Sequence, residues 1–101
     1  MNFAEAVREA ARLQALRTLA NAPDYTAADS LLQRALQSEG VAVSMASLRV
    51  ELGWLNENGF VVTQRAGGAT GVTIATLTDR GLDVAHGLSF PPGVARPRPG
   101  A

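Results

Sequence analysis

Apolar residues recur every three or four positions through the first twenty residues, which is the spacing of one face of an α-helix. This series consists of Phe3, Val7, Ala10, Leu13, Leu16 and Ala20. We therefore predict an amphipathic helix over residues 2–20 with this face turned toward the core. The opposite face is charged, and its spacing favours weak ion pairs on a solvated surface. Its charged residues are Glu5, Arg8, Glu9 and Arg12.

A second helical pattern follows Pro23, which disfavours helical geometry in the residue before it and so ends the first helix. Thr26 and Asp29 stand three residues apart ahead of an apolar stripe, an arrangement typical of a capped helix start. The stripe consists of Ala28, Leu31, Leu32, Ala35 and Leu36. Gly40 is suited to the left-handed position that closes a helix. Residues 41–43, Val-Ala-Val, are predicted as a short strand.

Ser44 is placed to cap a third helix, whose sequence is SMASLRVELGWLNENG. Leucines at helical spacing predict its buried ridge. They are Leu48, Leu52 and Leu55, and Gly59 closes the helix.

The pattern then changes from helical to extended. Residues 60–65 (FVVTQR) and 71–77 (GVTIATL) are rich in β-branched residues and flank a loop that begins after Arg65. The loop contains Gly67, Gly68 and Gly71. A phosphate-binding loop requires a helix after its glycines, whereas a second β-like segment follows these. We therefore interpret the loop as the tip of a β-hairpin.

A short last helix is predicted over residues 79–87, because Thr78 can cap its start and Gly87 can end it. Leu82 and Ala85 are expected to face inward.

Beyond Ser89 the chain holds four of its five prolines. Because 101 residues suffice for one hydrophobic core, we predict one domain over residues 1–88 and an extended tail over residues 89–101. Phe90 and Val94 are the residues expected to pin this tail to the domain.

Composition narrows the classes of function. Nine basic residues balance nine acidic ones, so the whole chain exerts no strong attraction on polyanions. The chain contains no cysteine, which excludes disulfides, thiolate metal sites and a cysteine nucleophile. The first helix is too charged for a signal peptide, and no stretch approaches the roughly 18 apolar residues of a membrane span. We expect a soluble cytoplasmic protein that makes no contact with membranes.

The order of the predicted elements, three helices, a hairpin with a glycine tip and a closing helix, resembles a winged helix-turn-helix domain. The run VSMASLRVELGWLNENGFV is similar to the recognition-helix segment of that superfamily, and ATLTDRGLDVAHG is similar to the segment leading from the second wing strand into the last helix. Over nearly the whole chain, including PGVARP of the tail, the sequence resembles small proteins of Mu-like prophages that are labelled ArsR-type transcriptional regulators.

This resemblance implies an α+β fold with a three-helix core, a two-stranded wing and a short C-terminal helix. It also implies a dimeric protein that binds DNA. Metal-sensing members of the ArsR group carry cysteine ligands, and this chain has none.

The leading hypothesis is a transcriptional regulator that binds double-stranded DNA, with the third helix in the major groove and the hairpin on the flanking backbone. Glu51 and Glu57 on the third helix would oppose this by repelling phosphate. The candidate contacts are Ser44, Ser47, Arg49, Asn56 and Arg65, with Arg96 and Arg98 of the tail as an arm that grips phosphate.

The alternative hypothesis is a winged helix that binds a phage or host protein and no DNA. The third helix carries an apolar set opposite its leucine ridge, which suits a protein partner if it is exposed. This set is Ala46, Val50, Gly53 and Trp54. Trp54 could instead pack against the first helix or the hairpin. We also expect a homodimer whose interface is supplied by the first helix, with the last helix or the tail as a further contributor.

A weak metal candidate lies on the last helix, where Asp79, Asp83 and His86 share one face. The helix dipole explains the same residues, since it favours acids in the first turn and a cation in the last. No Ser, His and acid arrangement indicates a nucleophile, so we expect neither a catalytic site nor a cofactor.

Overall fold

The computed structural model describes residues 2–68 and 71–97. Within them, four α-helices and a three-stranded antiparallel sheet form a mixed α+β fold, which confirms the predicted class. The elements are α1 (Phe3–Ala20), the short 3-10 helix η1 (Pro23–Tyr25), β1 (Thr26–Ala28), α2 (Asp29–Ser38), α3 (Met45–Glu57), β2 (Val61–Ala66), β3 (Val72–Leu77) and α4 (Asp79–Ala85).

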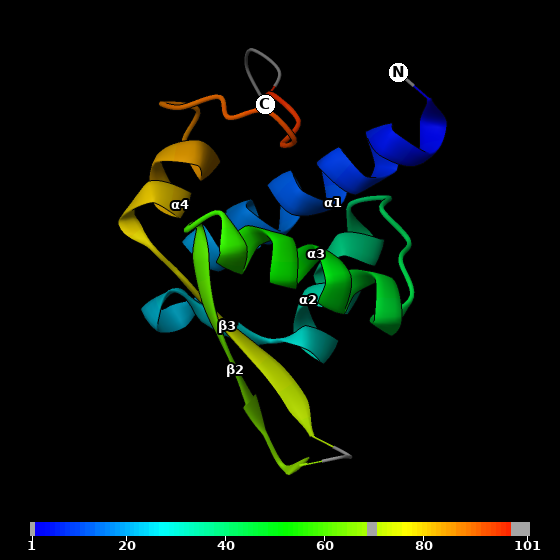
Figure 1. Cartoon of the computed structure of the whole chain (residues 1–101), viewed down its shortest axis with the longest axis vertical. Helices are drawn as coiled ribbons and strands as arrows, with labels where there is room; N and C mark the ends of the chain where they lie inside the picture. Colours follow the sequence, from blue (N-terminus) through cyan, green and yellow to red (C-terminus); the bar gives the residue numbers. More distant parts are fainter. Residues whose placement is uncertain (1, 69–70, 98–101) are drawn as a thin grey trace.

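The predicted hairpin is confirmed as β2 and β3, and it extends away from the helices as an elongated arm (Figure 1). The sequence did not predict β1, which pairs with the other edge of β3 and gives the strand order β1-β3-β2. Thr26 therefore lies in a strand opposite Thr76, and the predicted helix cap at Thr26 is wrong. A three-residue strand has little local signal, because it forms only where another strand offers an edge. Residues 41–44 form no strand.

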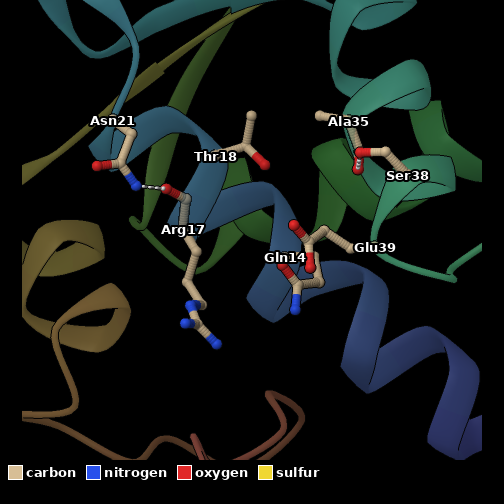
Figure 2. Close-up of a pocket in the computed structure, with 7 residues that line it drawn as sticks. All are labelled: Gln14, Arg17, Thr18, Asn21, Ala35, Ser38 and Glu39. Atoms are coloured by element: carbon tan, nitrogen blue, oxygen red, sulfur yellow. Dashed lines mark hydrogen bonds between the residues drawn. The ribbon is translucent and has the colours of Figure 1, made fainter. Parts of the chain in front are cut away.

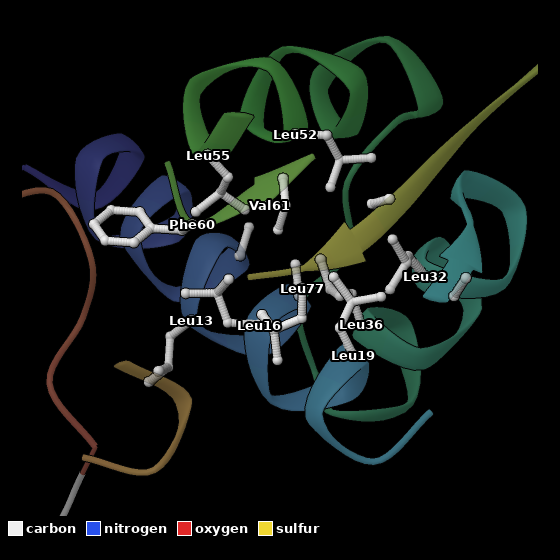
Figure 3. Packing of buried hydrophobic residues seen from close by; sticks show 14 of the residues in the cluster. Leu13, Leu16, Leu19, Leu32, Leu36, Leu52, Leu55, Phe60, Val61 and Leu77 are labelled. Carbon is white, nitrogen blue, oxygen red and sulfur yellow. The ribbon is translucent and has the colours of Figure 1, made fainter. Parts of the chain in front are cut away.

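The core lies where α1, α2 and α3 meet the sheet (Figure 3). The predicted leucine ridge of α3 is confirmed, since all three of its leucines are fully buried. The fully buried leucines of the three helices are Leu16, Leu19, Leu32, Leu36, Leu48, Leu52 and Leu55. This shared core fixes the three helices relative to one another.

The buried face of α1 differs from the predicted one at the start of the helix. Phe3 is 84% exposed, and Val7 and Ala10 are only partly buried. The core instead receives Ala11, Arg12, Leu13, Ala15, Leu16 and Leu19. The helix is rich in alanine and so presents apolar residues on more than one side, and packing against α2, α3 and α4 selects the side.

The cap of α4 is confirmed. The Thr78 hydroxyl accepts a hydrogen bond from the Gly81 N–H at 3.1 Å and donates one to the Gly59 carbonyl at 2.7 Å. Gly81 is buried so closely against the chain that an added Cβ would collide with the carbonyl oxygen of Phe60. The start of α4 is thus fixed against the turn between α3 and β2.

The tail folds back onto α1, as Figure 1 shows. Val94 is buried in the core as predicted, whereas Phe90 is 49% exposed and is covered on one face by the Arg96 guanidinium. The Ala95 N–H donates to the Glu9 carbonyl at 3.2 Å. Arg98 lies outside the described residues.

Within the described part of the chain, we find no helix with the length and apolar character needed to cross a membrane.

Candidate functional site

The start of α3 is organised by Ser44. Its hydroxyl oxygen accepts the Ser47 N–H at 3.1 Å and donates to the Ser47 hydroxyl at 3.0 Å. The predicted cap is therefore confirmed, and it uses the Ser44 side chain. Both serines are exposed, so the first turn of α3 presents two hydroxyl groups to the surroundings.

Arg49, one turn further along α3, is anchored rather than free. Its Nε donates to Oδ2 of Asp29 at 2.9 Å, and its Nη2 donates to the Gly71 carbonyl at 3.3 Å. The same Asp29 oxygen accepts the backbone N–H of Thr73 at 2.9 Å. The Arg49 side chain keeps 38% of its surface exposed. It thus joins α3 to the start of α2 and the start of β3.

Asp29 is 1% exposed and ionises readily despite its burial. Burial alone would raise the pKa of its carboxyl group. Hydrogen bonds from the backbone N–H of Thr73, the Arg49 side chain and the backbone N–H of Ser30 outweigh that cost, so the pKa of Asp29 lies below its ordinary value. A buried anion therefore stands at the junction of α2, α3 and the hairpin.

Two further candidates connect to the hairpin. Nη1 of Arg65 on β2 donates to the Thr73 hydroxyl at 3.1 Å, and Arg65 itself is exposed. Oδ1 of Asn56, near the end of α3, accepts the Thr63 N–H at 3.2 Å. Arg49 and Arg65 thus belong to one hydrogen-bond network that runs from Arg49 through Asp29 and Thr73 to Arg65. Asn56 helps to hold β2 against α3.

The glycine loop joins two antiparallel strands, which confirms its interpretation as a hairpin tip. Gly67 and Gly68 have φ values of +86° and +64°, which side chains rarely adopt. The next element that the structure describes after these glycines is strand β3 and not an α-helix, which differs from the strand-loop-helix order of a phosphate-binding loop.

The exposed side of α3 is apolar at Ala46 and at Val50, which is 59% exposed. Trp54, the fourth member of the predicted apolar set, is half-buried. The Arg12 guanidinium stacks 4.0 Å from the centroid of its ring system, and the Phe60 ring lies 6.2 Å away. A Cβ added to Gly93 of the tail would come within 2.6 Å of the Trp54 ring. Packing of Trp54 against the first helix is therefore confirmed.

An ion-pair cluster that the sequence did not reveal links α1 and α3. Glu51 is 4% exposed, and its carboxylate accepts hydrogen bonds from Nε of Arg12 at 2.8 Å and Nε of Arg8 at 3.1 Å. Its charge is therefore paired inside the protein and does not repel phosphate at the surface. The expectation that Glu51 is a surface charge is wrong. Arg12, expected on a solvated face, is 7% exposed and also donates to the Gly93 carbonyl at 2.8 Å.

Two adjoining grooves follow the first half of α1. One, of about 460 Å³, runs between Phe3, Ala6, Val7 and Ala10 and the segment 40–42. The other, of about 470 Å³, lies between α1 and α3 and reaches Ser47 and Val50. Val7 and Ala42 line both grooves, so together they form one largely apolar surface beside α3.

A smaller hollow of about 190 Å³ lies between the C-terminal halves of α1 and α2 (Figure 2). It is lined by polar and small side chains, among them Gln14, Arg17, Ser38 and Glu39. The Asn21 side chain points back to its own helix and donates to the Arg17 carbonyl at 3.0 Å. This hollow contains none of the candidate contacts.

Asp79, Asp83 and His86 of α4 and Arg96 of the tail take no part in the hydrogen bonds of Arg49, Asn56 and Arg65. Asp79, Asp83 and His86 are all exposed, and among residues 2–68 and 71–97 no three acidic or histidine side chains come together as metal ligands would. Arg96 is exposed and stacks on Phe90.

Comparisons with known proteins place the chain among phage proteins. No family model matches it. It is 39% identical over 90 residues to the uncharacterized protein gp26 of Escherichia phage Mu, an alignment that covers 89% of this chain and 90% of gp26. It is 33% identical over 82 residues to an uncharacterized protein of Haemophilus influenzae, covering 81% of this chain and 78% of that protein.

The expected relationship to Mu-like phage proteins is therefore confirmed, while the winged-helix and ArsR designations stay predictions. The chain belongs to the family of gp26 of Escherichia phage Mu.

Proposed function

We propose that this protein is a winged-helix DNA-binding protein that acts in transcriptional regulation. In this proposal α3 enters the major groove and the β2–β3 hairpin contacts the flanking backbone.

The topology supports the winged-helix assignment. A strand between the first two helices pairs with the second strand of a hairpin that follows the third helix. The hairpin then leads directly into α4. This order joins a helical unit to an adjoining two-stranded arm, the combination that the sequence resemblance implies.

The observation that carries the proposal is that one hydrogen-bond network fixes Arg49 of α3 and Arg65 of the hairpin. Arg49 donates to Asp29, which also accepts the Thr73 N–H, and the Thr73 hydroxyl accepts Arg65. The exposed Ser47 lies on the same helix as Arg49, near its N-terminal end. Polar groups at the start of a recognition helix and a cation on a neighbouring arm are what base and phosphate contacts require.

The test is a salt titration of duplex DNA binding. Each lost phosphate contact should reduce the magnitude of the negative slope of log K against log salt concentration by about 1. Arg65→Ala should therefore weaken binding and reduce the slope. Arg17→Ala is the control with the same change in charge, because Arg17 lines the polar hollow of Figure 2 and not the hairpin. If wild-type protein shows no duplex binding at about 50 mM salt, the proposal is wrong.

We also propose that the protein acts as a homodimer joined through the first half of α1. If two α1 helices pair antiparallel about Ala6 and Val7, Phe3 of each copy faces Ala10 of the other. Phe3 is 84% exposed, and an aromatic side chain buries roughly 150–250 Å². The two side chains alone would supply about a fifth to a third of the roughly 1,600 Å² of a standard interface.

A second candidate function is protein binding without DNA, and the exposed Val50 favours it. Val50 lies beside the apolar grooves of α1, and the chain carries no net charge to attract DNA. This candidate predicts no duplex binding at low salt, together with loss of a partner from Val50→Glu protein.

A further inference from the structure

The buried carboxylate of Asp29 lies beside the loop end of the hairpin, where α2, α3 and β3 meet. Asp29 is the first residue of α2 and is 1% exposed. It accepts hydrogen bonds from Arg49 of α3, from the backbone of Thr73 in β3 and from the backbone of Ser30. Among the described residues, no buried polar side-chain atom lacks a hydrogen-bond partner, so this carboxylate is fully used inside the protein.

A buried carboxylate is costly unless several donors are held around it in fixed positions. Two of the donors to Asp29 belong to α3 and β3. The free-energy cost of burying its carboxylate is therefore offset only when α3 and the hairpin keep the relative position that brings both donors to it. The hairpin extends from the helices as an arm (Figure 1), and Thr73 pairs with Arg65 only one residue pair before the loop, so the bonds around Asp29 hold the outer end of this arm. Thr73 is the second residue of β3, and the hydrogen bond from its N–H to Asp29 ties this end of β3 to the start of α2.

The same network fixes both candidate cations. Arg49 uses Nε on Asp29 and Nη2 on the Gly71 carbonyl, and the exposed remainder of its guanidinium faces outward from this anchor. Arg65 is held by the hydroxyl of Thr73, whose backbone N–H binds Asp29. A change at Asp29 would therefore move both arginines, although Asp29 touches only one of them.

We propose that Asp29 is a positioning residue for DNA binding, which aligns the hairpin and the two arginines without contacting DNA. This inference rests on the proposed function. Asp29 would determine the positions of Arg49 and Arg65 on the DNA-binding surface, although it is buried beneath that surface.

The test is a substitution for which simple electrostatics and the proposal predict opposite changes in DNA affinity. Asp29→Asn removes a negative charge and raises the net charge from +0 to +1, which by electrostatics alone would strengthen binding to DNA. The proposal predicts the opposite, a loss of affinity on the order of tenfold. Asp79→Asn is the matched control, because Asp79 is an exposed acid in the first turn of α4. It should bind DNA as well as wild type or slightly better.

A second readout needs no DNA. Amide hydrogen exchange in the free protein should speed up on the order of tenfold at Thr73 and its neighbours in β3 in Asp29→Asn protein, while the core leucines stay protected. Arg49→Lys keeps the positive charge but removes the Nε–H that binds Asp29, so amide exchange in β3 should speed up in this variant as well. This second variant tests the proposal if Asp29→Asn protein does not fold.

The outcomes separate the two claims. Wild-type protein that fails to bind duplex DNA refutes the proposed function, and with it the DNA-binding role of Asp29. Asp29→Asn protein that binds DNA as tightly as Asp79→Asn protein refutes the positioning role alone. Unchanged exchange of the β3 amides in both Asp29→Asn and Arg49→Lys protein likewise refutes it.

Discussion

Glu51 is the residue whose charge contributes most clearly to the stability of the fold. It is buried between α1 and α3 and accepts hydrogen bonds from two arginines, one of which is itself buried. The buried arginine, Arg12, also stacks on Trp54 and holds the tail through the Gly93 carbonyl. Removing the charge of Glu51 would leave the Arg12 guanidinium buried without a counter-charge.

We therefore predict that Glu51→Gln lowers the free energy of unfolding by about 3 kcal/mol, in the range for breaking a buried ion pair. Urea unfolding measures this change. Glu57→Gln is the control, since Glu57 lies on the same helix and is exposed, and it should change stability by less than about 0.5 kcal/mol. Equal stabilities of the two variants would show that the cluster does not hold α1 to α3.

Asp29 predicts a pH dependence at the acid end. Its pKa is lower in the folded protein than in the unfolded chain, so folding favours the ionised form. The resulting stabilisation is fully present above the unfolded pKa of about 3.9 and is lost as the pH falls through the lower folded value. Between about pH 6 and pH 3, wild-type protein should lose more unfolding free energy than Asp29→Asn protein. Parallel pH profiles would contradict the assignment.

At the scale of elements, Gly53 of α3 and Gly81 of α4 differ in the space available for a side chain, and helix propensity does not explain this difference. Gly81 of α4 lies against the Phe60 carbonyl and the Leu77 side chain, and it leaves no room for a Cβ. Gly53 of α3 has open space around its Cβ position. The contact at Gly81 lets α4 close over the turn that leads into β2.

The two substitutions to alanine should therefore change stability in opposite directions. Gly81→Ala should destabilise the protein by about 1–3 kcal/mol, because the backbone at Phe60 must shift. Gly53→Ala should stabilise it by about 0.5–1 kcal/mol through helix propensity. Thermal unfolding of both variants checks the prediction. If Gly81→Ala is also stabilising, α4 is not packed as described.

Elements with a strong local signal were predictable from the sequence. The α3 ridge, the hairpin with its glycine tip and the Thr78 cap each depend on neighbouring residues, and each is confirmed. The strand at Thr26 and the burial of Arg12 were not predictable, because each depends on a partner distant in sequence. For the same reason, the candidate site could be listed from the sequence, but the link from Arg49 to Asp29 and Thr73 could not.

At the scale of the whole molecule, the first half of α1 is the largest departure from a self-contained fold. Phe3 is almost fully exposed beside an apolar groove, although the rest of the helix is packed in the core. An exposed aromatic residue next to an apolar groove marks a contact surface.

The homodimer proposed at this surface predicts a solution mass of twice the chain's 10.5 kDa. Phe3→Ser should shift the protein toward the monomer in sedimentation or light scattering. Leu31→Ser is the control, because Leu31 is also exposed but lies on α2. A monomeric wild-type protein would rule out this dimer.

The central claim is that the start of α3 and the hairpin together contact DNA. The most direct measurement is NMR of labelled protein as duplex DNA is added at about 50 mM salt. We predict that the largest chemical-shift changes occur at Arg49 and Arg65. Changes confined to the α1 groove, or no changes at all, would contradict the account.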